Sequence, residues 1–320
     1  MSDSSITTPP ASKRPLGAAL SLLMVFTIGM GWAGGYALNR AAVEADIPLL
    51  PYAFLQLAGS AVILSVVLAL RRERPPLDFS HLKLYAISGV TAVGIPYLAI
   101  IYAAPHVPVG VLTLDLTLEP AFTYAFALLL ALERFHRVRL VGLVIGLIGL
   151  AIILVPETGL PSRTMVPWVL LGLLAPISWA IFSVYIAVVR RPEQSGVLIC
   201  WGLFTASALA ILPALVITGD FWWFTQPFDN DDLIVLGAIL YNPIVWFLAV
   251  ECVRLTGPVF YSLWGYIGTP AGMVLGILFF DERHSLWIWG ALVLLIIGLY
   301  LVNRTSAEAR RSRREATDFT

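Results

Sequence analysis

Ten apolar runs, each close to the length of a membrane-spanning helix, occupy most of the 320-residue chain. A helix needs about 20 predominantly apolar residues to cross a hydrocarbon core about 30 Å thick. The runs cover residues 16–38, 49–70, 82–104, 107–132, 138–155, 166–189, 197–217, 233–251, 258–280 and 286–302. No connection between them has room for a soluble domain. The sequence therefore predicts an all-α polytopic membrane protein with ten transmembrane helices.

Composition excludes several other classes of protein. Hydrophobic residues make up 59% of the chain and charged residues only 12%, against about 25% charged in soluble domains. The formal net charge is zero, and the basic residues form short clusters rather than the basic aromatic face that nucleic acids need. Cys200 and Cys252 lie in or beside apolar runs without a CxxC pattern, so we expect packing residues and no metal site or other cofactor.

The distribution of basic residues predicts the orientation in the membrane. Counted over alternate connections, seventeen of the 20 Lys and Arg fall on one side, and only Arg40, Arg163 and Arg283 fall on the other. Because Lys and Arg are enriched in cytoplasmic loops, both termini are expected in the cytoplasm, with the protein in the cytoplasmic (inner) membrane. Residues 1–15 are expected to be a disordered segment, and residues 303–320 a basic cytoplasmic tail.

The two halves of the chain, 16–155 and 166–302, share landmarks at an almost constant offset. The matching pairs are Trp32 and Trp179, Pro96 and Pro243, Pro120 and Pro270, Glu133-Arg134 and Glu282-Arg283, and Gly149 and Gly298. Each half holds five spans, an odd number, so the second half would cross the membrane with opposite polarity. Such inverted repeats are typical of transporters whose site lies between the repeats near the midplane. The paired prolines Pro96 and Pro243 are expected to interrupt their helices there and to free carbonyls that need partners.

Two carboxylates, Asp115 and Glu119, lie in the middle of the run 107–132. Ionisable groups at that depth usually face a water-filled site or a partner, and a spacing of four puts both on one helix face. Two such groups repel each other in a low-dielectric site, so we expect one to hold a proton near neutral pH and to exchange it for a cationic substrate. In the alternative, the acids only hydrogen-bond to a neighbouring helix and stabilise the bundle.

The other candidate residues are polar or aromatic side chains in the spans. Aromatic faces attract ammonium groups, and polar groups at mid-membrane are often functional. The candidates for substrate contact are Trp32, Tyr97, Trp179, Asn242 and Tyr261, with Thr269 and Gln56 weaker. Helix packing is the alternative role for the aromatic residues. Glu133-Arg134 and Glu282-Arg283, at opposite membrane faces, are candidate gate latches, with ion pairing at helix ends as the alternative.

These features together resemble the EamA-type transporters of the drug/metabolite transporter superfamily. The motifs that carry the resemblance are Trp32-Ala33-Gly34-Gly35, the run from Ala103 through Pro120 to Glu133-Arg134, Gly142, Gly146 and Gly149, and their counterparts Trp179-Ala180, Pro270 to Glu282-Arg283, and Gly290 to Gly298. The resemblance implies spans one to four and six to nine around a central cavity, with spans five and ten peripheral. It also implies outward movement of small metabolites by alternating access. Asp115 and Glu119 are not part of the family's common pattern.

The sequence thus predicts a secondary transporter, an exporter of an amino acid, an amine or a related small metabolite. Protons are the candidate coupling ion, and the protein is expected as a monomer or homodimer in the bilayer. Uncoupled facilitation, exchange or import of the same compounds stays open. An intramembrane enzyme is not expected, because no GxSxG or HExxH motif occurs. A non-transporting scaffold would not need carboxylates at the midplane.

Overall fold

The computed structural model describes residues 18–131, 135–154, 162–189, 195–224, 227–256, 261, 264–298 and 300–301, and within these residues every regular element is a helix. The first half contains α1 (Ala18–Glu44), α2 (Leu49–Leu70), α3 (Phe79–Gly89), α4 (Ile95–Ala103), α5 (Val109–Leu114), α6 (Glu119–Leu129) and α7 (Arg137–Leu154). The second half contains α8 (Val166–Gly172), α9 (Leu174–Val189), α10 (Gly196–Thr218), α11 (Asn230–Thr256), α13 (Trp264–Phe280) and a last apolar helix, Leu286–Gly298.

Length and composition support the membrane prediction. Within the described part of the chain, six helices are long and apolar enough to cross a bilayer: 19–44, 49–70, 79–103, 163–185, 196–218 and 230–253. Three shorter apolar helices, Leu140–Ile152, Trp264–Phe280 and Leu286–Gly298, fall in further predicted runs. The prediction of an all-helical, multi-pass membrane protein is confirmed.

The predicted continuous α-helix over 107–132 is wrong. A 3-10 turn, Asp115–Leu118, separates α5 from α6, and Pro120 stands in the first turn of α6. Proline lacks an N–H and its ring crowds the carbonyl four residues earlier, so the α-helical pattern ends in the preceding turn. Because a 3-10 turn rotates by about 120° per residue, the four-residue spacing no longer keeps positions 115 and 119 on one helix face.

The two mid-membrane prolines behave differently. Before Pro96 the backbone widens into a π-helical segment, Val90–Gly94, that joins α3 to α4, so this predicted interruption is confirmed. Pro243 lies inside α11, which remains one α-helix from Asn230 to Thr256, so the second interruption is wrong. The carbonyls freed at both prolines nevertheless have a polar side chain of another helix beside them. The Trp179 indole N–H donates to Ala92 O at 2.7 Å, and the Ser60 hydroxyl, whose shorter bond goes to Gln56 O at 2.6 Å, lies 3.3 Å from Ile239 O.

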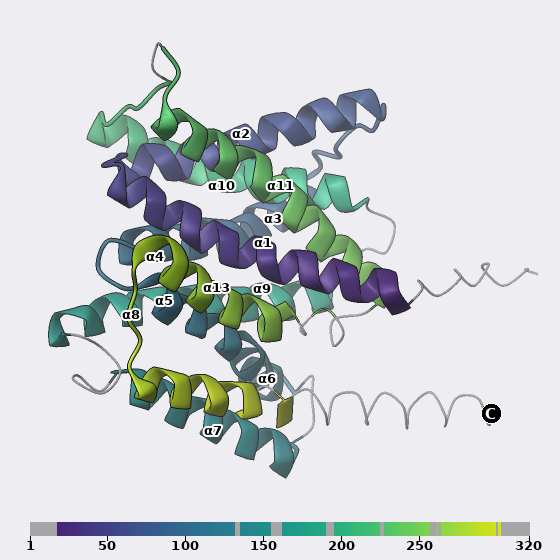
Figure 1. Ribbon diagram of the computed structural model, residues 1–320. Helices are drawn as coiled ribbons and strands as arrows, with labels where there is room; N and C mark the ends of the chain where they lie inside the picture. Colours follow the sequence, from purple (N-terminus) through teal and green to yellow (C-terminus); the bar gives the residue numbers. More distant parts are fainter. Residues whose placement is uncertain are drawn as a thin grey trace, which may run out of the picture.

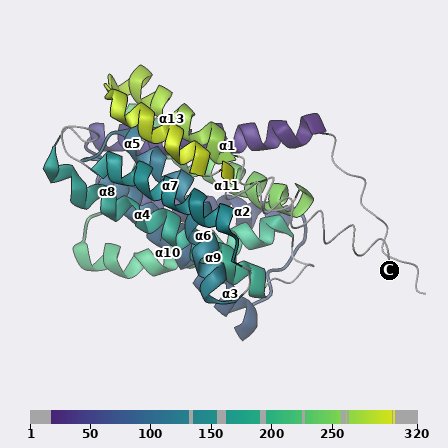
Figure 2. The same cartoon turned by 90° about the horizontal axis from the view of Figure 1, so that it is seen from below.

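The helix α1 crosses the front of the molecule in Figure 1, and contacts between helices join the two halves of the chain. The helix α1 packs against α11 and α13, α2 packs against α10 and α11, α4 packs against α8 and α9, and α6 packs against α9. Figure 1 shows α7 and the last helix together at the lower edge, and in Figure 2, seen from below, they lie in front of the other helices. A Cβ at Gly298 would lie 2.7 Å from Gly142 O, so glycine allows these two backbones to touch. These helices form a peripheral pair, as the family resemblance implies.

Candidate functional site

A buried polar network joins both halves of the chain at membrane depth. It contains Gln56 of α2, Tyr97 of α4, and Asn242 and Trp246 of α11, all less than a tenth exposed. The Tyr97 hydroxyl donates to Asn242 Oδ1, the Asn242 amide donates to Gln56 Oε1 at 2.9 Å, and the Trp246 indole donates to Tyr97 Oη at 3.1 Å. Polar groups in an apolar interior are stable only when they find such partners. The Gln56 amide nitrogen is buried and has no partner among the described residues, which leaves the network one spare donor.

A cluster of four indoles lies beside this network. Trp32 of α1 is at its centre, with ring centroids 5.3 Å from Trp179 of α9, 5.4 Å from Trp246 of α11 and 5.8 Å from Trp264 of α13. The matched tryptophans of the two halves, Trp32 and Trp179, therefore contact each other. These separations suit aromatic pairs that pack tilted or edge to face. The structure brings the predicted residues Trp32, Trp179, Tyr97 and Asn242 into one continuous group through Trp246.

The acidic part of the predicted site sits where α6 begins. Glu119 is partly buried and accepts a hydrogen bond from the Ser183 hydroxyl of α9 at 3.3 Å. Tyr261 lies beside the indole cluster, with its ring centroid 6.3 Å from that of Trp264. The backbone of Asp115 lies in the 3-10 turn, but its side chain falls outside the described residues.

Thr269 has different neighbours from the other candidates. Its hydroxyl is fully buried and donates to Thr113 O at 3.1 Å, while the Thr113 hydroxyl lies 3.5 Å from Thr269 O. These reciprocal contacts join α13 to α5. A hydroxyl bound to a carbonyl of the neighbouring helix satisfies that backbone group, so the described contacts of Thr269 are those of a helix-packing residue.

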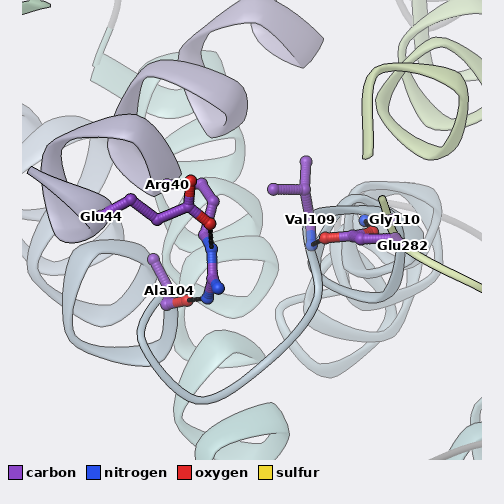
Figure 3. A network of polar contacts seen from close by, with 6 residues as sticks. All are labelled: Arg40, Glu44, Ala104, Val109, Gly110 and Glu282. Atoms are coloured by element: carbon purple, nitrogen blue, oxygen red, sulfur yellow. Dashed lines mark hydrogen bonds and ion pairs between the residues drawn. The ribbon is translucent and has the colours of Figure 1, made fainter. Parts of the chain in front are cut away.

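Of the four candidate latch residues, Glu133 and Arg134 lie outside the described residues, whereas Glu282 and Arg283 are described. Glu282 does not depend on its neighbour Arg283, which is exposed. Its carboxylate instead accepts the backbone N–H groups of Val109 and Gly110, the second at 3.0 Å (Figure 3). The first N–H groups of a helix have no partner within the helix and attract anions. Glu282 is therefore bound to the N-terminus of α5.

Several residues that contact other helices in the structure were not predicted from the sequence. Ser60 and Ser183 were not distinguished from other small polar residues in apolar runs. Ser60 lies four residues after Gln56 on α2, a spacing that could have linked it to the same helix face. Arg40, near the end of α1, donates to Ala104 O at 2.9 Å and to Glu44 at 3.0 Å. Its only sequence signal was that it is one of three basic residues on its side of the membrane.

Comparisons with known proteins agree with this architecture. Residues 19–155 match the EamA-like transporter family. Protein PecM of Dickeya dadantii (strain 3937) is 26% identical over 88% of this chain and 92% of its own length. An uncharacterized transporter of Bacillus subtilis (strain 168), YvbV, is 24% identical over 91% of this chain and 93% of its own.

Solved structures share the fold, among them a crystal structure. It covers 88% of this chain and 98% of its own, with a TM-score of 0.61 at 17% identity. The family match over residues 19–155, the relative named as a transporter and the helical bundle together support an EamA-type transporter of the drug/metabolite transporter superfamily, a membrane protein that handles a small-molecule substrate rather than an enzyme.

Proposed function

We propose that this transporter exports a small amino- or amine-bearing metabolite across the cytoplasmic (inner) membrane by alternating access, with protons as the coupling ion. The bundle consists of ten spans arranged as two inverted five-helix repeats, with both termini in the cytoplasm, and works as a monomer or homodimer. The first turn of α1 and the last turn of the final helix lie on the same side of the bundle (Figure 1), as an even number of spans requires.

Reciprocal helix contacts support the inverted repeat. When the halves are exchanged, the contact of α1 with α13 corresponds to that of α9 with α6. In the same way, α1 with α11 corresponds to α9 with α4, and α11 with α2 corresponds to α3 with α10. The carbonyls freed by the matched prolines likewise both face a polar side chain from another helix. A transporter of this design places its substrate between the repeats near the midplane.

The observation that carries the proposed site is the polar network of Gln56, Tyr97 and Asn242 beside the indole cluster, because both groups draw residues from both halves. A few directed polar groups within an aromatic wall are typical of small-molecule sites. In this proposal Tyr97 and Asn242 orient the polar end of the substrate.

The aromatic and acidic residues supply the specificity for a cation. Trp32, Trp179 and Tyr261 present aromatic faces, which attract an ammonium group by cation–π interaction. Glu119, with Asp115, exchanges a proton for the positive charge of the substrate. Glu119 is a partly exposed residue whose carboxylate accepts a hydrogen bond from Ser183, which fits that role, because a group that exchanges protons must be able to meet an aqueous compartment.

The test is transport by the purified protein in proteoliposomes. A panel of radiolabelled amino acids and amines is first screened by counterflow, which needs no driving force, and the hits are then driven by a pH gradient. Replacing Glu119 by Gln is expected to preserve counterflow and abolish the response to the gradient. Asp115→Asn is tested in parallel, with Asp220→Asn in the exposed connection after α10 as the control.

Two results would count against the proposal. If Glu119→Gln and Asp115→Asn both keep the parent pH dependence, proton coupling through these acids is wrong, and an uncoupled facilitator or exchanger takes its place. If gradients drive the hits inward under every condition, the protein is an importer.

A further inference from the structure

The short loop of residues 104–108 is held at both ends by charged side chains from other parts of the chain (Figure 3). It connects α4 to α5. At its first residue, Arg40 of α1 donates from Nη1 to Ala104 O at 2.9 Å, and Arg40 Nε donates to Glu44 at 3.0 Å. Just beyond its last residue, Glu282 accepts the N–H groups of Val109 and Gly110. A cation and an anion thus hold opposite ends of one loop.

Each charge has the sign that its helix end favours. Ala104 follows the C-terminus of α4, where unpaired carbonyls give a partial negative charge, and Val109 begins α5, where unpaired N–H groups give a partial positive charge. The Glu282 side chain is only 8% exposed, so water and salt screen its attraction weakly. A Cβ at Gly276 would lie 2.2 Å from Glu282 Oε2, so glycine at that position of α13 makes room for the carboxylate.

Both contacts are suited to release. Each joins a side chain to backbone groups at a helix end, and water can replace either partner once the ends separate. The loop is also stiff, because Pro105 and Pro108 fix their own φ angles and restrict the residues before them. In the middle of the loop His106 stacks on Trp168 of α8, with ring centroids 3.8 Å apart, and Val107 is buried. When the two ends are released, the stiff loop can leave these neutral contacts as a unit.

We infer that Arg40 and Glu282 form a latch that holds the loop 104–108 closed at the extracytoplasmic end of the protein, and that outward opening requires the release of both contacts. The side of the membrane rests on the proposed orientation. The inference differs from the pairing of Glu282 with Arg283 that the sequence suggested. Glu282 instead binds the N-terminus of α5, and the positive charge of the latch is Arg40 at the other end of the loop.

The test measures access to the loop without any substrate. Val107 lies in the loop and is fully buried, so Val107→Cys reports opening when a membrane-impermeant maleimide is added to one side of oriented vesicles. Adding Arg40→Ala or Glu282→Ala is expected to speed labelling from the outer side roughly 5- to 30-fold, which corresponds to the loss of about 1–2 kcal/mol from the closed form. Arg163→Ala, an exposed arginine on the same predicted side, is the matched control and should change the rate less than about twofold.

Native cysteines separate latch opening from loss of the fold. Cys200 and Cys252 are fully buried, so a variant in which the reagent also reaches them has loosened throughout and is replaced by Arg40→Lys or Glu282→Gln. If every folded variant labels at the parent rate, the latch is overturned whether or not transport is observed. Faster labelling only from the cytoplasmic side would preserve the latch and overturn the proposed orientation.

Discussion

Asn242→Leu should destabilise the bundle by disconnecting the buried polar network. Leucine keeps a branched side chain of nearly the same outline but removes the acceptor for Tyr97 and the donor to Gln56. Hydrogen bonds between helices in membranes contribute about 0.6 kcal/mol on average and up to about 1.7 kcal/mol. Loss of both bonds is therefore expected to lower the free energy of unfolding by about 1–3 kcal/mol.

A double-mutant cycle with Gln56→Leu measures the coupling free energy between Asn242 and Gln56. Once Asn242 is replaced, both polar atoms of the Gln56 amide are buried without a partner, because its nitrogen has none in the parent protein either. Replacing Gln56 as well removes that unpaired group, and a buried polar atom without a partner is itself destabilising. The double variant is expected to be more stable than the sum of the two single effects by about 0.6–1.7 kcal/mol.

The assay is denaturant unfolding in detergent micelles, followed by tryptophan fluorescence. Asn39→Leu is the matched control, because among the described residues the Asn39 amide takes part in a single hydrogen bond, from the Tyr52 hydroxyl at 3.2 Å. The free energy of unfolding should fall about half as much in Asn39→Leu as in Asn242→Leu. If the two substitutions of the cycle add to within about 0.3 kcal/mol, the residues do not form an energetic network, and the argument for a pre-organised site at Asn242 fails.

Two further predictions concern regions outside the proposed substrate site. Gly298→Ala should lower the free energy of unfolding by about 1–3 kcal/mol relative to Gly290→Ala. The new Cβ at position 298 would lie 2.7 Å from Gly142 O, whereas nothing lies within 4 Å of a Cβ at position 290. Equal stability of the two variants would rule out backbone contact between α7 and the last helix. Burial lowers the pKa of His284, and the nearby Glu282 carboxylate only partly opposes that shift. A group with a lowered folded pKa loses its stabilisation as pH falls, so between about pH 7 and about pH 5 the parent should lose more thermal stability than His284→Gln. Identical losses measured by thermal unfolding would show that His284 has the same affinity for protons in both states.

The sequence by itself determined the architecture at the level of spans. A run of about 20 apolar residues is a local property, because the thickness of the hydrocarbon core fixes the required length without reference to the rest of the chain. The same holds for the effect of Pro120, since a missing N–H and a crowded carbonyl act within one helical turn. The break before α6 was therefore available in principle from the sequence, although a continuous helix was predicted there.

Only the tertiary structure decided which groups are partners. The carbonyl freed by Pro96 is bound by an indole 87 residues away, and the one freed by Pro243 faces a hydroxyl 179 residues away. Such pairs depend on how the helices pack, and no periodicity in the sequence encodes them. For the same reason Glu282 could be recognised as a charge at a helix end, while its true partner, the N-terminus of α5, could not. In an apolar interior each polar group must bind whatever partner the packing supplies, so the packed structure, and not the local sequence, assigned the contacts of the proposed site.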